Sequence, residues 1–114
     1  MKKIALVAFT GEAMCFQHAL LNALDMQAKG HDVKLVIEGS ATKQIALMTG
    51  SGGLAQLYER VREAGLIDCA CKACAAKMGS LEAAEEQGLE LRGEMSGHPS
   101  LATYLEAGYE LVVM

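Results

Sequence analysis

Gly65-Leu66-Ile67-Asp68-Cys69-Ala70 runs directly into Cys71-Lys72-Ala73-Cys74-Ala75-Ala76-Lys77-Met78-Gly79, and this segment decides the fold. The mostly apolar run Leu66–Ala70 has the length of a buried strand, and Cys71–Gly79 predicts the helical turns that follow it. Gly65 suits the end of a preceding helix, because a residue without Cβ adopts a left-handed backbone at little cost. The segment therefore predicts a strand placed between two helices.

The same glycine punctuation recurs along the chain. A glycine stands just before each later strand-like run, and a further apolar run, Ile4–Phe9, opens the chain. The later pairs are Gly30 with Asp32–Ile37, Gly88 with Leu89–Leu91 and Gly108 with Tyr109–Met114. Because these runs are nearly continuously apolar, they indicate a parallel sheet covered on both faces. We expect a three-layer α/β/α fold around a five-stranded, mainly parallel sheet.

Three longer segments have helical periodicity. They cover Glu12–Lys29, Leu54–Ala64 and a last helix that starts near Pro99. The predicted buried stripes are Phe16, Leu20 and Leu24 with Ala13, Leu21 and Ala28 in the first, Leu54, Leu57, Tyr58 and Val61 in the second, and Leu101, Tyr104 and Leu105 in the third. Between them, Ser40–Gly53 shows no clear period. Its glycines predict a loop rather than a phosphate-binding motif, because the Gly-Lys-Ser/Thr ending is absent.

Composition limits the functional classes. A chain of 114 residues has the length of one domain, so we expect a single domain over residues 1–114. Apolar residues make up 52% and charged residues 21%, which excludes a disordered chain. The net charge of -4, with no Lys/Arg cluster, argues against nucleic acid as a partner. No apolar run is long enough to span a membrane, and the start lacks a signal cleavage site, so we expect a cytoplasmic protein. The high apolar fraction in so small a chain indicates a hydrophobic surface covered by self-association.

The chemistry of this chain lies in its cysteines. In a reducing cytoplasm, thiols serve as reactive groups or ligands more often than as disulfides. Cys71 and Cys74 lie one turn apart where a strand turns into a helix. The free N–H groups there stabilise an anion, so we expect a lowered thiol pKa at Cys71, and Lys72 adds a positive charge. This position is also the edge of an open α/β sheet at which ligands bind.

Other uses of these residues stay open. Cys69 inside the strand suits a small buried hydrophobe. A zinc site would draw on Cys71 and Cys74, with further ligands from Cys69, His98, His31 or another chain. Because the sequence has no second Cys-x-x-Cys pair, we assign no metal and no cofactor. A thioredoxin-type redox role is a further alternative, although that motif usually follows the first strand of its fold.

The histidines and the remaining cysteine differ in their placement. His98 follows the predicted fourth strand on the same sheet edge as the cysteines, where it suits an acid, a base, a ligand or a helix cap. His31 at a helix exit suits a solvated position, and His18 suits hydrogen bonds with its own helix. Cys15, next to Phe16, is interpreted as a core residue.

The sequence resembles the DsrE/DsrF-like family of small cytoplasmic proteins of sulfur relay and sulfur oxidation. The resemblance rests on Lys3–Ala8, on Gly65–Cys74 running on to Gly79, and on Ala107–Val113. In that family a cysteine just past the third strand, upstream of a glycine, accepts sulfur as a persulfide. Cys71 with Gly79 matches that arrangement, and Cys74 matches the second cysteine of some members. The resemblance implies assembly into trimers or hexamers and exchange of sulfur with donor and acceptor proteins or small thiols.

From these observations we predict a sulfur carrier or sulfurtransferase-type protein. Cys71 and Cys74 are the predicted reactive residues, while Lys72, Cys69 and His98 are predicted to assist binding. Cys71 would hold sulfane sulfur as a persulfide, and Cys74 would either resolve it through a disulfide or tune the first thiol. The alternatives are a zinc module that uses the same thiols and a non-catalytic interaction protein in which the cysteines are simply buried.

Overall fold

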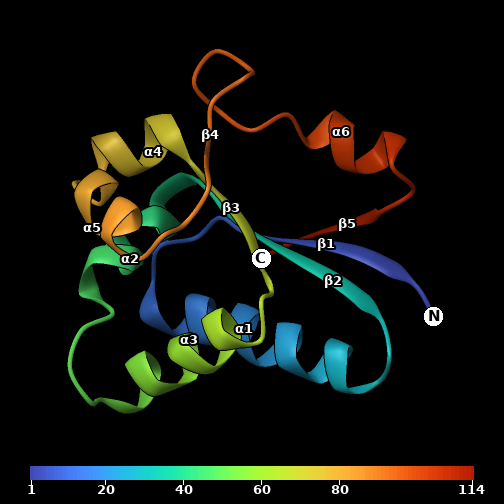
Figure 1. Cartoon of the computed structure of the whole chain (residues 1–114), viewed down its shortest axis with the longest axis horizontal. Coiled ribbons are helices and arrows are strands. Elements are labelled where there is room, and N and C mark those ends of the chain that lie inside the picture. The colour runs from blue at the N-terminus through green and yellow to red at the C-terminus, as the bar shows by residue number, and fades with distance from the viewer.

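The computed structural model describes residues 1–114 and contains a five-stranded parallel sheet with strand order β4-β3-β2-β1-β5 (Figure 1). This confirms the predicted α/β fold. The strands are β1 (Lys3–Ala8), β2 (Asp32–Ile37), β3 (Ile67–Cys71), β4 (Leu91–Arg92) and β5 (Glu110–Val113). The helices are α1 (Ala13–Ala28), the 3₁₀ helix η1 (Gly39–Thr42), α2 (Lys43–Leu47), α3 (Gly53–Glu63), α4 (Lys72–Lys77), α5 (Leu81–Glu86) and α6 (Leu101–Glu106).

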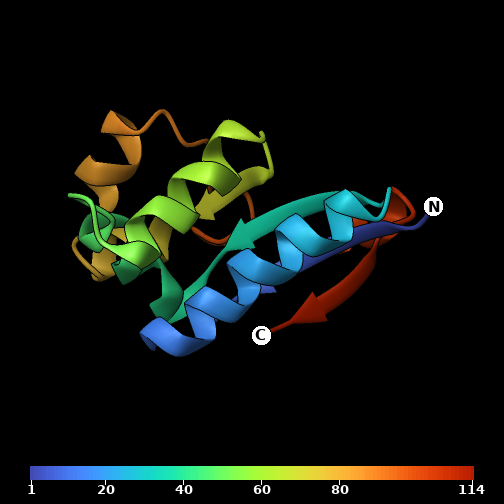
Figure 2. The same cartoon turned by 90° about the horizontal axis from the view of Figure 1, so that it is seen from below.

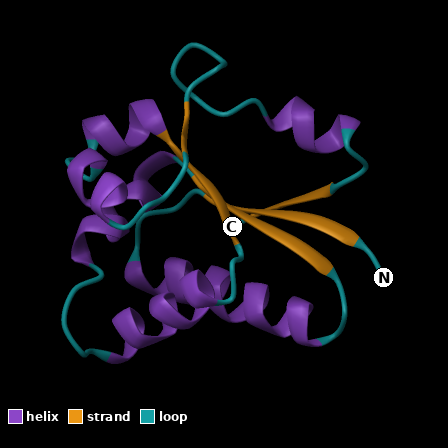
Figure 3. Ribbon diagram, viewed as in Figure 1, coloured by secondary structure: helices purple, strands orange, loops and turns teal.

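The two faces of the sheet are covered unequally. In Figure 1, α1 and α3 lie below the sheet, while α6 lies above it near β5, and Figure 2, seen from below, has α1 in front of the strands. The short helices α2, α4 and α5 gather beyond the carboxyl ends of the strands (Figure 3). The core on the α1 side contains seventeen buried residues, whereas the core on the α6 side contains six. These six are Ala5, Val7, Val36, Cys69, Tyr104 and Tyr109.

A β-bulge changes the direction of side chains in β3. Leu35 pairs with Ile67, but the next residue, Val36, pairs with Cys69, so Asp68 is an extra residue in the strand. A bulge of this kind re-aims neighbouring side chains. Asp68 and Cys69 consequently both reach the hydroxyl of Tyr104 on the α6 side of the sheet.

The predicted glycine helix ends are confirmed. Gly30, Gly65, Gly88 and Gly108 all have positive φ, between 72° and 89°. At Gly65 the backbone N–H bonds to the carbonyl of Arg62 at the end of α3, and the chain then enters β3. A side chain at this φ would strain the backbone, which explains why a glycine stands there.

Several local predictions were wrong. The segment Ser40–Gly53 contains most of η1 and all of α2, which are too short to give a readable period, and α5 was not predicted. The fourth strand is Leu91–Arg92 rather than Leu89–Leu91, and α6 begins at Leu101. Four residues of the predicted buried stripes are exposed, because the buried stripe of each helix is narrower than the predicted one: Ala13, Leu21, Ala28 and Leu105. None of the helices combines the length and the apolar character that crossing a membrane requires.

Candidate functional site

Cys71 and Cys74 lie where β3 passes into α4. Cys71 ends the strand with extended backbone angles and is the N-cap residue of α4. Its sulfur accepts a hydrogen bond from the backbone N–H of Cys74 at 3.4 Å. The thiol therefore takes the place that an oxygen-bearing side chain usually occupies at a helix start.

His98 joins these two thiols from a distant part of the sequence. Its Nδ1 lies 3.0 Å from the sulfur of Cys71 and 3.5 Å from the sulfur of Cys74. One ligand atom from each of the three residues lies within 4.8 Å of the other two. The alternative of a helix cap is wrong for His98, because the N-cap of α6 is Ser100. We call Cys71, Cys74 and His98, together with Glu38 described below, the thiol site.

A tight loop, Gly93–His98, covers the thiol site. The backbone N–H of Gly97 bonds to the carbonyl of Gly93, and the carbonyl of Gly97 accepts from the N–H of Ala73 in α4 at 2.9 Å. Gly97 has a φ of 97°, and a Cβ there would lie 2.9 Å from that of Ala73. The loop therefore packs on the first turn of α4. The carbonyl of Gly97 lies 3.8 Å from the sulfur of Cys71, which is fully buried.

Glu38 is a site residue that the sequence reasoning missed. It follows β2 directly, and the pairing of Ile37 with Ala70 places it level with Cys71 on the neighbouring strand. Continued alternation of side chains puts both on the α6 face of the sheet. Glu38 is buried, and its Oε1 is the one buried side-chain polar atom of the chain without a hydrogen-bond partner. A carboxylate directly after a buried apolar strand was the available signal.

The electrostatics of Cys71 differ from the sequence expectation. Burial raises the pKa of the Cys71 thiol to about 12, with further upward contributions from Cys74 and the negative charge of Glu38. The backbone N–H of Cys74 acts in the opposite direction, as predicted, but is too weak to prevail. The expected lowering was therefore wrong, because desolvation of a buried thiolate outweighs one N–H at a short helix. Lys72 lies on the exposed side of α4.

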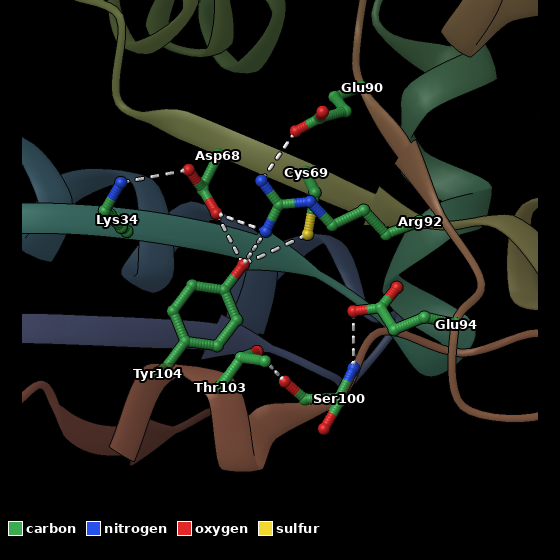
Figure 4. Close-up of polar contacts among 9 residues, drawn as sticks. All are labelled: Lys34, Asp68, Cys69, Glu90, Arg92, Glu94, Ser100, Thr103 and Tyr104. Atoms are coloured by element: carbon green, nitrogen blue, oxygen red, sulfur yellow. Dashed lines mark hydrogen bonds and ion pairs between the residues drawn. The ribbon is translucent and has the colours of Figure 1, made fainter. Parts of the chain in front are cut away.

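Cys69 lies in a separate group of polar side chains, drawn in Figure 4. Its sulfur contacts the Tyr104 hydroxyl at 3.3 Å, and that hydroxyl donates to the Asp68 carboxylate. Arg92 Nη1 lies 3.0 Å from both the Asp68 carboxylate and the Tyr104 hydroxyl, and Lys34 Nζ lies 3.3 Å from Asp68. We call these five residues the Asp68 network. Cys69 is fully buried, as predicted, and burial raises the pKa of its thiol to about 11. Unlike a purely apolar core residue, it has a polar partner in the Tyr104 hydroxyl.

The Asp68 network is linked to the loop over the thiol site. Arg92 ends β4 and also pairs with Glu90 at 2.7 Å. Further along, the carboxylate of Glu94 accepts from the backbone N–H of Ser100 at 3.0 Å, and Thr103 bonds to the Ser100 carbonyl (Figure 4). The loop Gly93–His98 is therefore held before its start by the contacts of Arg92 and is closed by the bond between Glu94 and Ser100. These contacts hold His98 in its position.

The other predicted candidates lie apart from the thiol site. His31 Nδ1 accepts a hydrogen bond from the backbone N–H of Lys2 at 3.0 Å. Both residues directly precede a strand, so this contact lies at the amino ends of β1 and β2, away from the thiols at the carboxyl ends. His18 is exposed on α1 and binds Asn22 through its carbonyl. Cys15 is half-buried. The ligand atoms that lie within 4.8 Å of one another at the thiol site come only from Cys71, Cys74 and His98.

The pocket of this chain is also separate from the thiols. It has a volume of about 320 Å³ and is lined by residues of α3, the start of β3 and the segment Gln87–Glu90. Arg62 in its wall is already paired with Glu59 and with the carbonyl of Gln87. The thiol site is thus a covered group of side chains at the sheet edge and not a preformed cavity.

The fold and the site define a class of protein, a parallel five-stranded α/β protein with two cysteines and a histidine at the carboxyl edge of its sheet. Within this class, the chain belongs to the DsrE/DsrF-like family, which it matches over residues 2–114. This confirms the resemblance described above. The family is associated with sulfur relay.

Three archaeal proteins are similar in sequence to this chain. An uncharacterized protein of Methanocaldococcus jannaschii is 31% identical over 96 residues, which cover 83% of this chain and 76% of the relative. An uncharacterized protein of Archaeoglobus fulgidus is 42% identical over 41 residues, covering 36% of this chain and 67% of the relative. A second one from that organism is 47% identical over 36 residues, covering 32% and 97%. No solved structure matches the chain significantly.

Proposed function

We propose that this protein is a sulfur carrier that holds sulfane sulfur as a persulfide on Cys71 and passes it to an acceptor thiol. The observation that carries this proposal is the contact of one imidazole nitrogen with two thiols, at 3.0 Å and 3.5 Å, at the carboxyl edge of the sheet. Membership of a family associated with sulfur relay supports it.

The loading step needs a proton acceptor. Because burial raises the pKa of Cys71 to about 12, little thiolate exists at neutral pH, and an adjacent base has to take the proton as the donor approaches. His98 Nδ1 is in hydrogen-bond reach of that proton. The helix N–H of Cys74 then stabilises the sulfur anion. His98 is accordingly the base in this proposal, a more specific role than the binding role predicted from the sequence.

The transfer balances without an added oxidant or reductant. The Cys71 thiolate attacks the outer sulfur of a donor persulfide, the donor S–S bond breaks, and the donor leaves as a thiolate. An acceptor thiolate then attacks the outer sulfur of the Cys71 persulfide and regenerates the Cys71 thiolate. Alternatively, Cys74 attacks the inner sulfur, which forms the Cys71–Cys74 disulfide and releases sulfide. In this route a small thiol has to reduce the disulfide before the protein can load again. Because Cys71 is buried, the donor has to approach past the half-buried Cys74.

The wider predictions belong to the same proposal. A single domain over residues 1–114, a cytoplasmic location and a homo-oligomer of three or six chains suit a small thiol-dependent carrier. Its partners would be sulfur donor and acceptor proteins or small thiols. Lys72, exposed beside Cys71 in the sequence, suits contact with a charged donor or acceptor rather than with the buried sulfur.

The test is mass spectrometry of the intact protein and its peptides after incubation with glutathione persulfide. We expect one added sulfur on Cys71, loss of that sulfur in Cys71→Ser, and persistence of it in Cys74→Ser, where the disulfide route is blocked. Cys15→Ser is the matched control and should load normally. His98→Gln should load more slowly, by about 100-fold if it removes general-base assistance. Wild-type loading in Cys71→Ser would overturn the proposal.

A further inference from the structure

The thiol site has the composition of a soft-metal site. Two cysteine sulfurs and one imidazole nitrogen point toward a common region, with their ligand atoms within 4.8 Å of one another. Thiolate and imidazole ligands bind Zn²⁺ well and bind Mg²⁺ and Ca²⁺ poorly, because the latter prefer oxygen. The sequence offered His98 only as one of several possible further ligands, and no metal was assigned because a second Cys-x-x-Cys pair is absent. Folding selects His98, because it brings the imidazole against both thiols.

The distances fit Zn²⁺ after a small adjustment. With bonds of about 2.3 Å to sulfur and 2.0 Å to nitrogen, tetrahedral zinc places sulfur and nitrogen about 3.5 Å apart. Cys74 and His98 are already 3.5 Å apart, and Cys71 and His98 are 3.0 Å apart. Cys71 and His98 would thus separate by about half an ångström, which a rotation of the half-buried imidazole can provide.

A second, independent observation points to a cation at this place. Glu38 is buried on the same face, and its Oε1 has no partner. A buried carboxylate oxygen normally has a hydrogen-bond donor or a cation beside it, because desolvation of the charge is otherwise unfavourable. A metal with a water molecule in the fourth position would supply both a positive charge and a donor to Glu38.

We propose that Cys71, Cys74 and His98 bind one Zn²⁺ ion through two thiolates and Nδ1, with an exchangeable fourth ligand that donates to Glu38. Binding forms three metal–ligand bonds and releases the two thiol protons to solvent. The fourth position stays open to water, sulfide or a small thiol, as in zinc sites with three protein ligands.

The proposal has a consequence for sulfur transfer, and that consequence rests on the proposed function. A sulfur bound to zinc is not free to attack a donor persulfide, and a persulfidated Cys71 presents a different ligand atom. Zinc occupancy and sulfur loading would therefore exclude each other at the same two cysteines. Removal of zinc would then be the step that activates the carrier.

Titration of the reduced, metal-free full-length protein with Co²⁺, followed by displacement with Zn²⁺, tests metal binding without any sulfur assay. We expect one Co²⁺ per chain, a sulfur-to-cobalt charge-transfer absorption and visible bands typical of tetrahedral cobalt. A tenfold excess of Mg²⁺ should leave the spectrum unchanged. Absence of the charge-transfer absorption, or binding well below one ion per chain, would overturn the proposal.

Variants assign the ligands. Cys71→Ser, Cys74→Ser and His98→Gln should each weaken Zn²⁺ binding more than about 100-fold, whereas Cys15→Ser should bind like the wild type. Glu38→Gln should weaken binding by about 10-fold as an outer-shell change. Circular dichroism verifies that each variant is folded. Wild-type affinity in a folded His98→Gln variant would contradict the site, and wild-type affinity in Glu38→Gln would contradict the role of Glu38.

The two proposals fail separately. If zinc binds as described but the zinc-free protein takes up no sulfur from glutathione persulfide, the sulfur-carrier function fails and the metal site stands. If sulfur loads on Cys71 but zinc does not bind, the reverse holds. Equal loading of the zinc-bound and zinc-free protein would overturn the mutual exclusion alone.

Discussion

The Asp68 network and the thiol site lie on the same face of the sheet and share strand β3, yet their polar atoms are paired very differently. Asp68 is bonded to Tyr104, Arg92 and Lys34. Glu38 is more deeply buried, and one of its carboxylate oxygens has no partner. Burial alone therefore does not define the role of a polar group. A buried carboxylate with a full set of hydrogen-bond partners stabilises the fold, whereas one with a free oxygen can still bind a ligand.

The two carboxylates show this contrast in their protonation. Burial by itself raises the pKa of Asp68, but the Tyr104 hydrogen bond and the charges of Arg92 and Lys34 outweigh it and hold the pKa below its usual value of 3.8. Burial also raises the pKa of Glu38, and the charge of His98 offsets only part of that increase. The two groups therefore give opposite dependences of stability on pH.

The largest expected effect concerns thiol reactivity in the folded protein. Because burial raises the pKa of the Cys71 thiol well above the usual 9.0, much less thiolate exists at pH 7, and Cys71 should react with iodoacetamide at least about 100-fold more slowly than in the denatured chain. The rate at Cys71 should rise about tenfold per pH unit between pH 7 and 10. Tandem mass spectrometry after timed labelling measures it. A rate that levels off below pH 8 would mean that the Cys71–His98 pair is already ionised.

The next largest effect is expected when the central carboxylate of the Asp68 network is removed. Asp68→Asn should lower the free energy of unfolding by about 2 kcal/mol at pH 7, below the value for a fully buried ion pair because Arg92 and Lys34 retain solvent contact. Since the pKa of Asp68 is lowered, its stabilisation is present above pH 3.8 and is lost as the pH falls through the lowered value. Urea denaturation at pH 7 and pH 3 should show the difference shrinking in acid.

The matched control for that experiment is Glu90→Gln. Glu90 also pairs with Arg92, but its side chain is 60% exposed, so its loss should change stability by less than about 0.5 kcal/mol. Equal effects of the two variants would mean that the buried partner is no more important than the exposed one, and the comparison between the two regions would lose its basis.

A smaller effect is expected for Tyr104→Phe. This change removes the donor to Asp68 and the contact with the Cys69 sulfur while keeping the ring in the α6-side core. We expect a loss of about 1 kcal/mol by urea denaturation, typical of one hydrogen bond. Metal binding and sulfur loading should stay at wild-type levels, because Tyr104 does not contact the thiol site. A loss of either property in a folded variant would show that the two regions are coupled.

The last effect has the opposite sign, because a substitution stabilises the protein. Glu38→Gln should stabilise the metal-free protein by up to about 1 kcal/mol at pH 7, because it removes a buried charge without a full set of partners. The pKa of Glu38 is raised, so wild-type stability is complete below pH 4.5 and decreases as the pH rises through the raised value. Thermal denaturation at pH 4 and pH 7 should show the gain only at pH 7. Destabilisation at pH 7 would reveal a partner for Glu38 in solution.

The elements that depend only on neighbouring residues were predictable from the sequence. Continuous apolar runs predicted the parallel sheet, and glycines such as Gly65 marked helix ends, because each signal arises from local backbone preference and side-chain period. Adjacency in the chain also placed Cys71 and Cys74 one turn apart at a helix start. The short helices α2 and α5 escaped prediction because they have too few residues for a readable period.

Only the tertiary structure decided how these residues are used. It separated Cys69 from Cys71 by turning the former toward Tyr104 beside a bulge, and it brought His98 and Glu38 to the thiols from other strands. It also reversed the expected pKa change at Cys71, because desolvation depends on what covers the sulfur and not on its sequence neighbours. Local sequence specifies backbone conformation, whereas burial and long-range contacts, which set the chemistry of a thiol, exist only after the chain has folded.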